Sequence, residues 1–122
     1  MPALTRLGVA NQLSQAMEPT DQEAFADFAQ RLRHLLPDVE VRAFGSRARG
    51  TADRDSDLDV CIVAEAVTAE VRETVYRIAW EVGLEHDCML IAPILLSRDD
   101  FENGPMSASA LVANIRRDGV AA

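Results

Sequence analysis

Two aspartates separated by a single residue, Asp57 and Asp59, begin the segment DLDVCIV, which is otherwise apolar. In a β-strand, residues two apart project from the same face, so the two carboxylates are expected to lie side by side. Adjacent carboxylates repel each other, and this strand holds no lysine or arginine to offset them. Oxygen ligands of this kind suit Mg²⁺ or Mn²⁺, so the pair predicts a divalent metal site.

A second group of residues lies just before this pair. The dipeptide Gly45-Ser46 interrupts the strand-like run VRAF, and Arg47 and Arg49 follow it. At a strand-to-helix turn, backbone N–H groups, a hydroxyl and arginines are typical of a phosphate-binding site. Phosphate-binding groups beside a dicarboxylate metal site indicate a protein that handles nucleoside triphosphates.

The spacing of these residues carries a resemblance. Gly45-Ser46, ten intervening residues and then Asp57-x-Asp59 resemble the signature of the DNA-polymerase-β-like nucleotidyltransferase superfamily. The segment GSRARG…DSDLDV is most similar to sequences of the minimal nucleotidyltransferases (MNT), which are commonly paired with HEPN proteins as antitoxins. The superfamily has a third metal-binding carboxylate on a following strand, and the resemblance places it at Asp87.

What this resemblance implies is a Mg²⁺-dependent transfer of a nucleotidyl group, most simply AMP from ATP, to a hydroxyl. Two metal ions are expected, with Mn²⁺ as an alternative to Mg²⁺. By the same resemblance, the acceptor is a tyrosine of a HEPN-type partner and the protein is an antitoxin. The implied site residues are three catalytic, metal-binding carboxylates (Asp57, Asp59 and Asp87) and four nucleotide contacts (Gly45, Ser46, Arg47 and Arg49).

Other functions stay open at the level of sequence. The protein could act as an antitoxin by binding alone, with little catalysis. Transfer to a small molecule such as an antibiotic is weaker, because nothing beyond the core is left to form a drug pocket. Calcium binding by the acidic loop that starts at Asp53 is disfavoured, because the loop lacks the glycine and the final acid of an EF-hand.

Composition narrows the class of protein. A chain of 122 residues is long enough for one domain with a hydrophobic core. The net charge of −8 argues against a broad nucleic-acid-binding surface, which needs a basic footprint. Because the chain has no lysine, contacts to phosphate are expected from Arg47, Arg49 or Arg54, from backbone amides and from metal. The sequence shows no membrane-span pattern and no export signal, so a cytoplasmic protein is expected. Cys61 and Cys88 fall in expected strands and are interpreted as small buried hydrophobic residues.

The order of the expected elements predicts an α/β fold. Residues 1–18 are expected to form an N-terminal segment, predicted to be helical, and residues 19–122 the nucleotidyltransferase domain. Thr20-x-x-Glu23 has the form of a capping box that would start the first helix of this domain. The elements expected after that helix are a strand before Gly45, a strand from Asp57, a helix over 67–84, a strand over 85–91 and a helix over 108–117. Together with the resemblance, this order predicts a polymerase-β-like fold, a small mixed sheet of three or four strands with helices mainly on one face.

The expected helix over 67–84 has two apolar sides. One carries a stripe of valine and isoleucine that should cover the sheet. Tyr76, Trp80 and Leu84 fall toward the opposite side. An exposed aromatic pair is typical of interfaces, so this side is a candidate for a partner contact or a homo-oligomer. The alternative is that the N-terminal segment or the C-terminal helix covers it.

Overall fold

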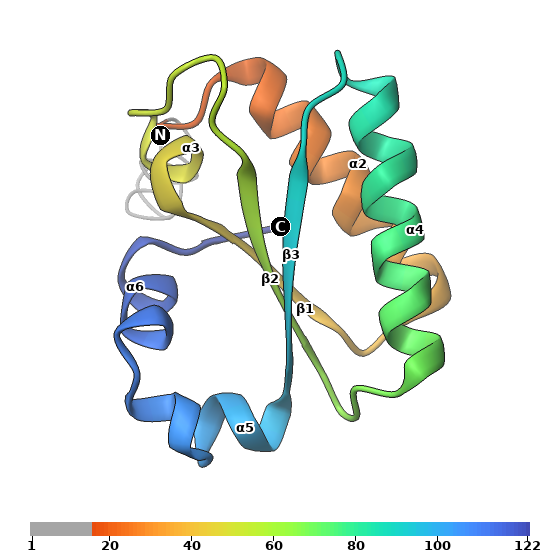
Figure 1. Cartoon of the computed structure of the whole chain (residues 1–122), viewed down its shortest axis with the longest axis vertical. Helices are drawn as coiled ribbons and strands as arrows, with labels where there is room; N and C mark the ends of the chain where they lie inside the picture. The colour runs from red at the N-terminus through yellow and green to blue at the C-terminus, as the bar shows by residue number, and fades with distance from the viewer. Residues whose placement is uncertain (1–15) are drawn as a thin grey trace, which may run out of the picture.

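A mixed sheet of four strands, in the order β3-β2-β1-β4, forms the centre of the molecule in the computed structural model, which describes residues 16–122 (Figure 1). The strands are β1 (Glu40–Phe44), β2 (Leu58–Ala64), β3 (Ile91–Ser97) and β4 (Val120–Ala121). β1 runs antiparallel to both β2 and β4, whereas β2 and β3 are parallel. The predicted α/β fold with a mixed sheet is confirmed.

Helices cover both faces of this sheet. The helical elements are α2 (Pro19–Leu35), α3 (Gly45–Arg49), α4 (Ala69–Glu85), α5 (Arg98–Glu102), the 3-10 turn η1 (Pro105–Ala108) and α6 (Ala110–Asp118). The two long helices, α2 and α4, lie side by side on one face, while the shorter α5 and α6 lie on the other (Figure 1). None of the helices within the described residues is long and apolar enough to cross a membrane.

The alternation of side chains along β2 divides the core in two. Leu58, Val60 and Ile62 belong to the larger apolar cluster, which includes residues of α2 and α4. Cys61 and Val63 belong to a second cluster, which includes residues of α5 and α6. Since side chains two apart share a face, Asp59 lies on the α5/α6 face of the sheet, above Cys61.

The start of α2 differs from the sequence prediction. The helix begins at Pro19, with Glu18 as its N-cap and no side-chain cap, so Thr20 lies inside the first turn and the predicted capping box is not formed. Proline is favoured at the first helical position because its φ angle is already helical. The predicted helix within residues 1–18 lies outside the described residues except at its end, where Met17 is buried in the core.

The predicted strand over 85–91 is wrong. Helix α4 continues to Glu85, a turn follows, and β3 begins only at Ile91. Asp87 and Cys88 in this turn have φ angles of 57° and 56°, which lie in the left-handed region and cannot belong to a strand. Cys88 is therefore exposed, against the prediction, whereas Cys61 is buried as expected. Pro93 is tolerated in β3 because this is an edge strand.

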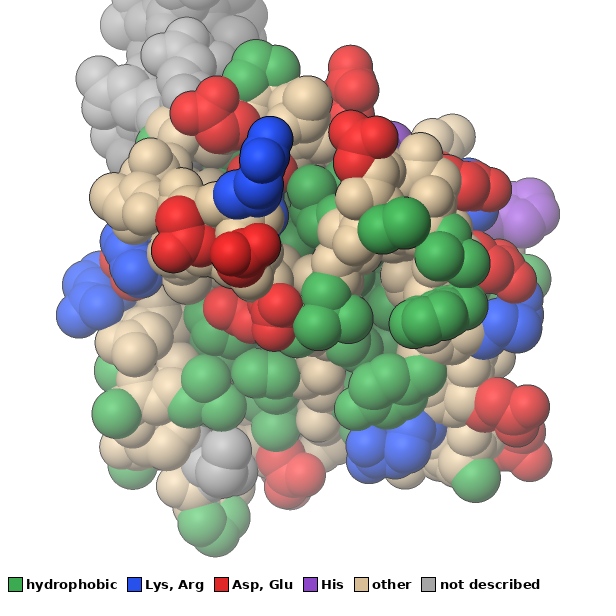
Figure 2. Space-filling model, turned by 45° about the horizontal axis from the view of Figure 1, so that its top comes forward, with side chains coloured by type: hydrophobic (Ala, Val, Ile, Leu, Met, Phe, Trp, Pro, Cys, Tyr) green, Lys and Arg blue, Asp and Glu red, His purple; other side chains and the backbone are tan. Residues whose placement is uncertain are grey.

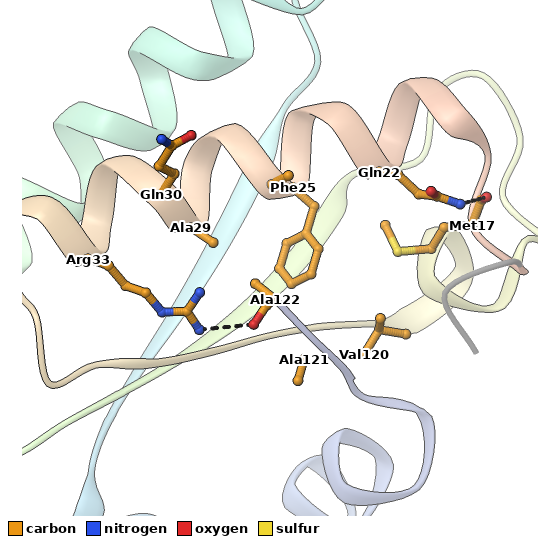
Figure 3. Close-up of a pocket in the computed structure, with 10 residues that line it drawn as sticks. Met17, Gln22, Phe25, Ala29, Gln30, Arg33, Val120, Ala121 and Ala122 are labelled. Carbon is orange, nitrogen blue, oxygen red and sulfur yellow. Dashed lines mark hydrogen bonds between the residues drawn. The ribbon is translucent and has the colours of Figure 1, made fainter. Parts of the chain in front are cut away.

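The short strand β4 was not predicted, because two residues carry no periodicity. It pairs with β1 and borders a cavity of about 380 Å³ beside α2. In Figure 3, Arg33 of α2 reaches Ala122, whose carbonyl oxygen accepts its hydrogen bond at 3.2 Å. On the other side of the cavity, the Gln22 side chain donates to the carbonyl oxygen of Met17 at 2.7 Å.

Candidate active site

The two aspartates lie at the start of β2. Asp57 immediately precedes the strand and is exposed, while Asp59 is half-buried as its second residue. On the neighbouring strands, Asp59 lies opposite Phe44 of β1 and Ala92 of β3. Burial, and then the charge of Asp57, raise the pKa of the Asp59 carboxyl. The two carboxylates are therefore close enough for the charge of Asp57 to act on Asp59.

The chemistry of this pair fits a divalent cation. Neither Asp57 nor Asp59 forms an ion pair with any arginine within residues 16–122. Two adjacent carboxylates, one of them half-buried and with a raised pKa, gain from a cation placed between them. Their oxygens are the ligands that Mg²⁺ and Mn²⁺ prefer.

The Gly45 turn lies directly against Asp59. Gly45 has a φ of +78°, and a Cβ atom added there would lie 2.6 Å from Oδ2 of Asp59. Both facts require glycine at this position, since other residues rarely adopt this φ and the added carbon would overlap the carboxylate. The short helix α3 starts at this glycine, with no side chain capping its first turn. The turn therefore brings backbone N–H groups next to the carboxylate of Asp59.

Alanine at position 45 is expected to destabilise the domain by about 1–3 kcal/mol and to disable the site, because it strains the turn and displaces Asp59. Gly50 is the comparison, since its φ of +75° carries similar backbone strain, and an added Cβ there overlaps the carbonyl oxygen of Ala16 at 2.1 Å and does not meet Asp59. Urea unfolding and nucleotidyl transfer would be measured for both variants under conditions in which each is folded. Equal activity of Gly45→Ala and Gly50→Ala would contradict this account of the turn.

Arg47 is held inside the protein. Its Nε donates to the carbonyl oxygen of Ser56 at 2.7 Å, and one terminal nitrogen pairs with Oδ1 of Asp21, also at 2.7 Å. The other terminal nitrogen donates to the carbonyl oxygen of Arg54 at 3.2 Å. Asp21 is only 2% exposed, so this guanidinium neutralises a buried charge and joins the start of α2 to the loop before β2. Arg47 was predicted as a phosphate contact, but in the structure its side chain donates three hydrogen bonds to other residues of the domain.

The other arginines near the turn are more exposed. Arg49 pairs with Oδ2 of Asp118 at 3.2 Å and is half-exposed. The side chain of Arg54 is exposed and lines the same cleft as Asp57. The sequence offers Arg54 as a phosphate contact alongside Arg47 and Arg49, and in the structure Arg54 is more accessible than Arg47.

A cleft of about 1130 Å³ opens at this end of the sheet. Its charged lining is acidic in excess: Asp21, Glu23, Asp55, Asp57, Glu85 and Asp87 against Arg47 and Arg54, with His86 beside them. The volume is of the size that enzyme and ligand sites occupy. The acidic balance means that an anionic ligand in this cleft needs a cation to accompany it.

Asp87 does not join the aspartate pair on the sheet. It is exposed in the turn after α4, where it lines the same cleft as Asp57. The positions of β3 beside the pair are apolar instead: Ala92 lies opposite Asp59, and the carbonyl oxygen of Leu90 accepts a hydrogen bond from the N–H of Leu58 at 2.9 Å. No three acidic, histidine or cysteine side chains in residues 16–122 gather as a metal site. The expected cluster of three carboxylates depended on a strand that the chain does not form.

Two contacts at the cleft were missed from the sequence. Besides the Asp21–Arg47 pair, Nε2 of His86 lies 3.0 Å from Oδ2 of Asp27 and joins the turn to α2. Burial raises the pKa of Asp27, but the hydrogen bonds from His86 and Arg31 outweigh it and lower the pKa overall. A signal for the first contact was present, because Asp21 interrupts the apolar stripe that continues at Phe25.

Comparison with known proteins identifies the class. The sequence model described as the nucleotidyltransferase domain matches residues 26–116, most of the chain, and includes the Gly45 turn and both aspartates. The chain therefore belongs to the nucleotidyltransferase domain family and is an enzyme of that class. This confirms the resemblance that the GS and DxD spacing indicated.

Two relatives carry the comparison further. A protein of Methanocaldococcus jannaschii is 35% identical over 79 residues, which cover 62% of this chain and 79% of that protein. The protein MntA of Haemophilus influenzae is 53% identical over 34 residues, 28% of this chain and 30% of its own length. Both are provisionally named protein adenylyltransferases.

Proposed function

We propose that this enzyme transfers AMP from ATP to a hydroxyl group of a protein, with Mg²⁺ or Mn²⁺ held by Asp57 and Asp59. The observation that carries the proposal is the close approach of the Gly45 turn to Asp59. In this proposal the turn binds phosphate and Asp59 binds metal, so the two functions lie side by side. The names of the two relatives support AMP as the group transferred and a protein as its acceptor.

Each group in the site has a role in this proposal. The bound metal supplies charge neutralisation at the triphosphate and at the entering and leaving oxygens. Asp57 and Asp59 hold it, while the N–H groups of Gly45 and Ser46 bind phosphate oxygens. Arg54 and the exposed Arg49 are the guanidinium contacts. The accessible position of Arg54 on the cleft supports its part.

The reaction is an in-line displacement at the α-phosphorus. The acceptor oxygen forms a bond to phosphorus, the bond from phosphorus to the pyrophosphate oxygen breaks, and pyrophosphate leaves with the bonding electrons. The acceptor proton passes to a carboxylate, for which we propose Asp87, because it lines the same cleft as Asp57. In this role Asp87 does not need to be a metal ligand.

The biological setting in this proposal is that of an MNT antitoxin in the cytoplasm, with a tyrosine of a HEPN-type toxin as the acceptor. A second candidate function, neutralisation of the toxin by binding alone, is favoured by one observation. The β3 positions beside the aspartates are Leu90 and Ala92, so the sheet supplies two carboxylates to the site instead of the expected three.

The experiment that separates these functions is transfer of label from α-labelled ATP, with Mg²⁺, in an extract of the source cell. We expect one labelled protein band with the wild type and none with the Asp57→Ala/Asp59→Ala variant. The variant Glu70→Ala/Glu73→Ala is a matched control, because it removes two exposed carboxylates from α4. An unlabelled toxin that co-purifies equally with all three forms would establish binding alone.

A further inference from the structure

Large hydrophobic side chains gather on one exposed surface beside the active site. Tyr76, Trp80 and Leu84 follow one another every four residues along α4 and are 46%, 65% and 54% exposed. Leu90, just before β3, is 55% exposed. These four residues, here called the Trp80 face, surround a shallow cavity of about 280 Å³. In Figure 2, hydrophobic side chains gather next to a group of acidic ones.

The Trp80 face continues into the catalytic cleft. Cys88, Met89 and Leu90 line both the cavity on this face and the acidic cleft that contains Asp57. The carbonyl oxygen of Leu90 bonds to the N–H of Leu58, which lies between the two aspartates in the sequence. Since hydrogen-bonded strands are about 5 Å apart, a molecule that is seated on this face and extends past Leu90 reaches the end of β2, where Asp57 lines the cleft.

Charge limits what can occupy the face. The cleft at its border has six acidic residues and two arginines, and Arg47 is already paired with Asp21. A second copy of this chain, whose net charge is also −8, would bring a second acidic cleft toward the first. Such like-charge contacts oppose association. A partner with an apolar surface bordered by basic residues would be complementary to both the Trp80 face and the acidic cleft.

We propose that the Trp80 face is the docking site for the protein that receives the nucleotidyl group. The acceptor packs an apolar surface on Tyr76, Trp80 and Leu84, and its basic border meets the acidic cleft. Its hydroxyl then projects past Leu90 to Asp57 and Asp59. This inference rests on the proposed function and adds to it the place where the acceptor is selected. Exposed tryptophan and tyrosine are the residues that most often anchor protein interfaces.

The first test compares labelling of the acceptor with binding of ATP. Trp80→Ala and Leu84→Ala are expected to lower the rate of label transfer at least tenfold when the acceptor in the extract is limiting. Their affinity for ATP, measured directly by equilibrium binding of labelled ATP, should change less than twofold. Leu35→Ala is the matched control, because Leu35 is 52% exposed at the end of α2 and does not line the cleft.

The possible results separate this inference from the function on which it rests. Label transferred at the wild-type rate by Trp80→Ala and Leu84→Ala overturns the docking site but leaves the proposed function in place. No label with the wild type overturns both. A loss of ATP affinity in Trp80→Ala would show that the face binds the nucleotide base instead of the acceptor, and would overturn the docking site. A wild-type dimer that Trp80→Ala converts to monomer would assign it to a second copy.

A cross-linking measurement tests the location independently. Cys88 is exposed where the face meets the cleft, whereas Cys61 is buried and burial raises its pKa to about 11, so a maleimide reacts at Cys88. A benzophenone maleimide on Cys88 should cross-link an acceptor that unmodified enzyme has already labelled. The same reagent on the Leu35→Cys/Cys88→Ser variant should not. Equal cross-linking from both positions would contradict the proposal.

Discussion

Asparagine at position 59 is expected to abolish nucleotidyl transfer while making the folded domain more stable in the absence of divalent cations. The change removes one of the two carboxylates that hold the metal in the proposed mechanism. Stabilisation of reacting charge by a metal is worth several kcal/mol, so the rate should fall about 1000-fold or more. The same change removes the repulsion between the half-buried carboxylate of Asp59 and the exposed carboxylate of Asp57.

The sign of the stability effect follows from the raised pKa of Asp59. The folded chain holds the Asp59 proton more tightly than the unfolded chain does, so folding stability falls as the pH rises through this range. The neutral asparagine avoids that loss. Asp57→Asn should also be inactive but gain less, because the burial of Asp59, the larger cause of its raised pKa, remains.

The measurement is urea unfolding at neutral pH in EDTA and again in Mn²⁺, alongside transfer assays. The wild type should gain stability from Mn²⁺, because binding to the folded state alone stabilises it by mass action. Asp59→Asn should be the more stable protein in EDTA and should lose most of the Mn²⁺ effect. A variant that is active, or less stable than the wild type in EDTA, would show that the pair is not a repulsive metal-binding site.

Removal of the Arg47 side chain is expected to cost about 3–5 kcal/mol of unfolding free energy, a large part of the total for a small domain. The reason is that Arg47→Ala leaves the carboxylate of Asp21, which is 2% exposed, without its cation. The carbonyl oxygens of Ser56 and Arg54 lose their donor in the same step. The loop that leads into the aspartate pair would then lose its attachment to α2.

Comparison with Arg49 makes this prediction specific. Arg49→Ala breaks a half-exposed ion pair with Asp118 and should cost at most about 1 kcal/mol. In the Arg47→Ala background, Asp21→Asn should restore part of the stability, because it removes the buried charge that was left unpaired. Urea unfolding of the single and double variants gives these values. A loss for Arg47→Ala no larger than that for Arg49→Ala would mean that the buried pair contributes little.

The parts of the site that the sequence predicted are those set by local geometry. The DxD pattern indicated the start of β2, where Asp59 lies, and Gly45 marked the turn beside Asp59. Helical periodicity correctly predicted that Tyr76 and Trp80 are exposed, because the opposite side of α4 carries the residues that face the core.

The parts that failed depend on backbone conformation and distant contacts. The segment HDCMLI alternates like a strand, but the left-handed conformations of Asp87 and Cys88 turn the chain there and delay β3. The role of Arg47 depends on Asp21, which is 26 residues away in the sequence. An arginine after a GS turn has the same appearance whether it binds phosphate or an internal carboxylate.

The central position of β2 has a consequence for how the enzyme responds to its ligands. β2 is hydrogen-bonded to β1 on one side and β3 on the other, and Leu58 and the four residues Val60–Val63 are 0% exposed. Its amide hydrogens should exchange with solvent deuterium only when the whole domain unfolds. Nucleotide binding should therefore slow exchange mainly in the exposed loop around Arg54, since the strand that carries Asp59 is already ordered.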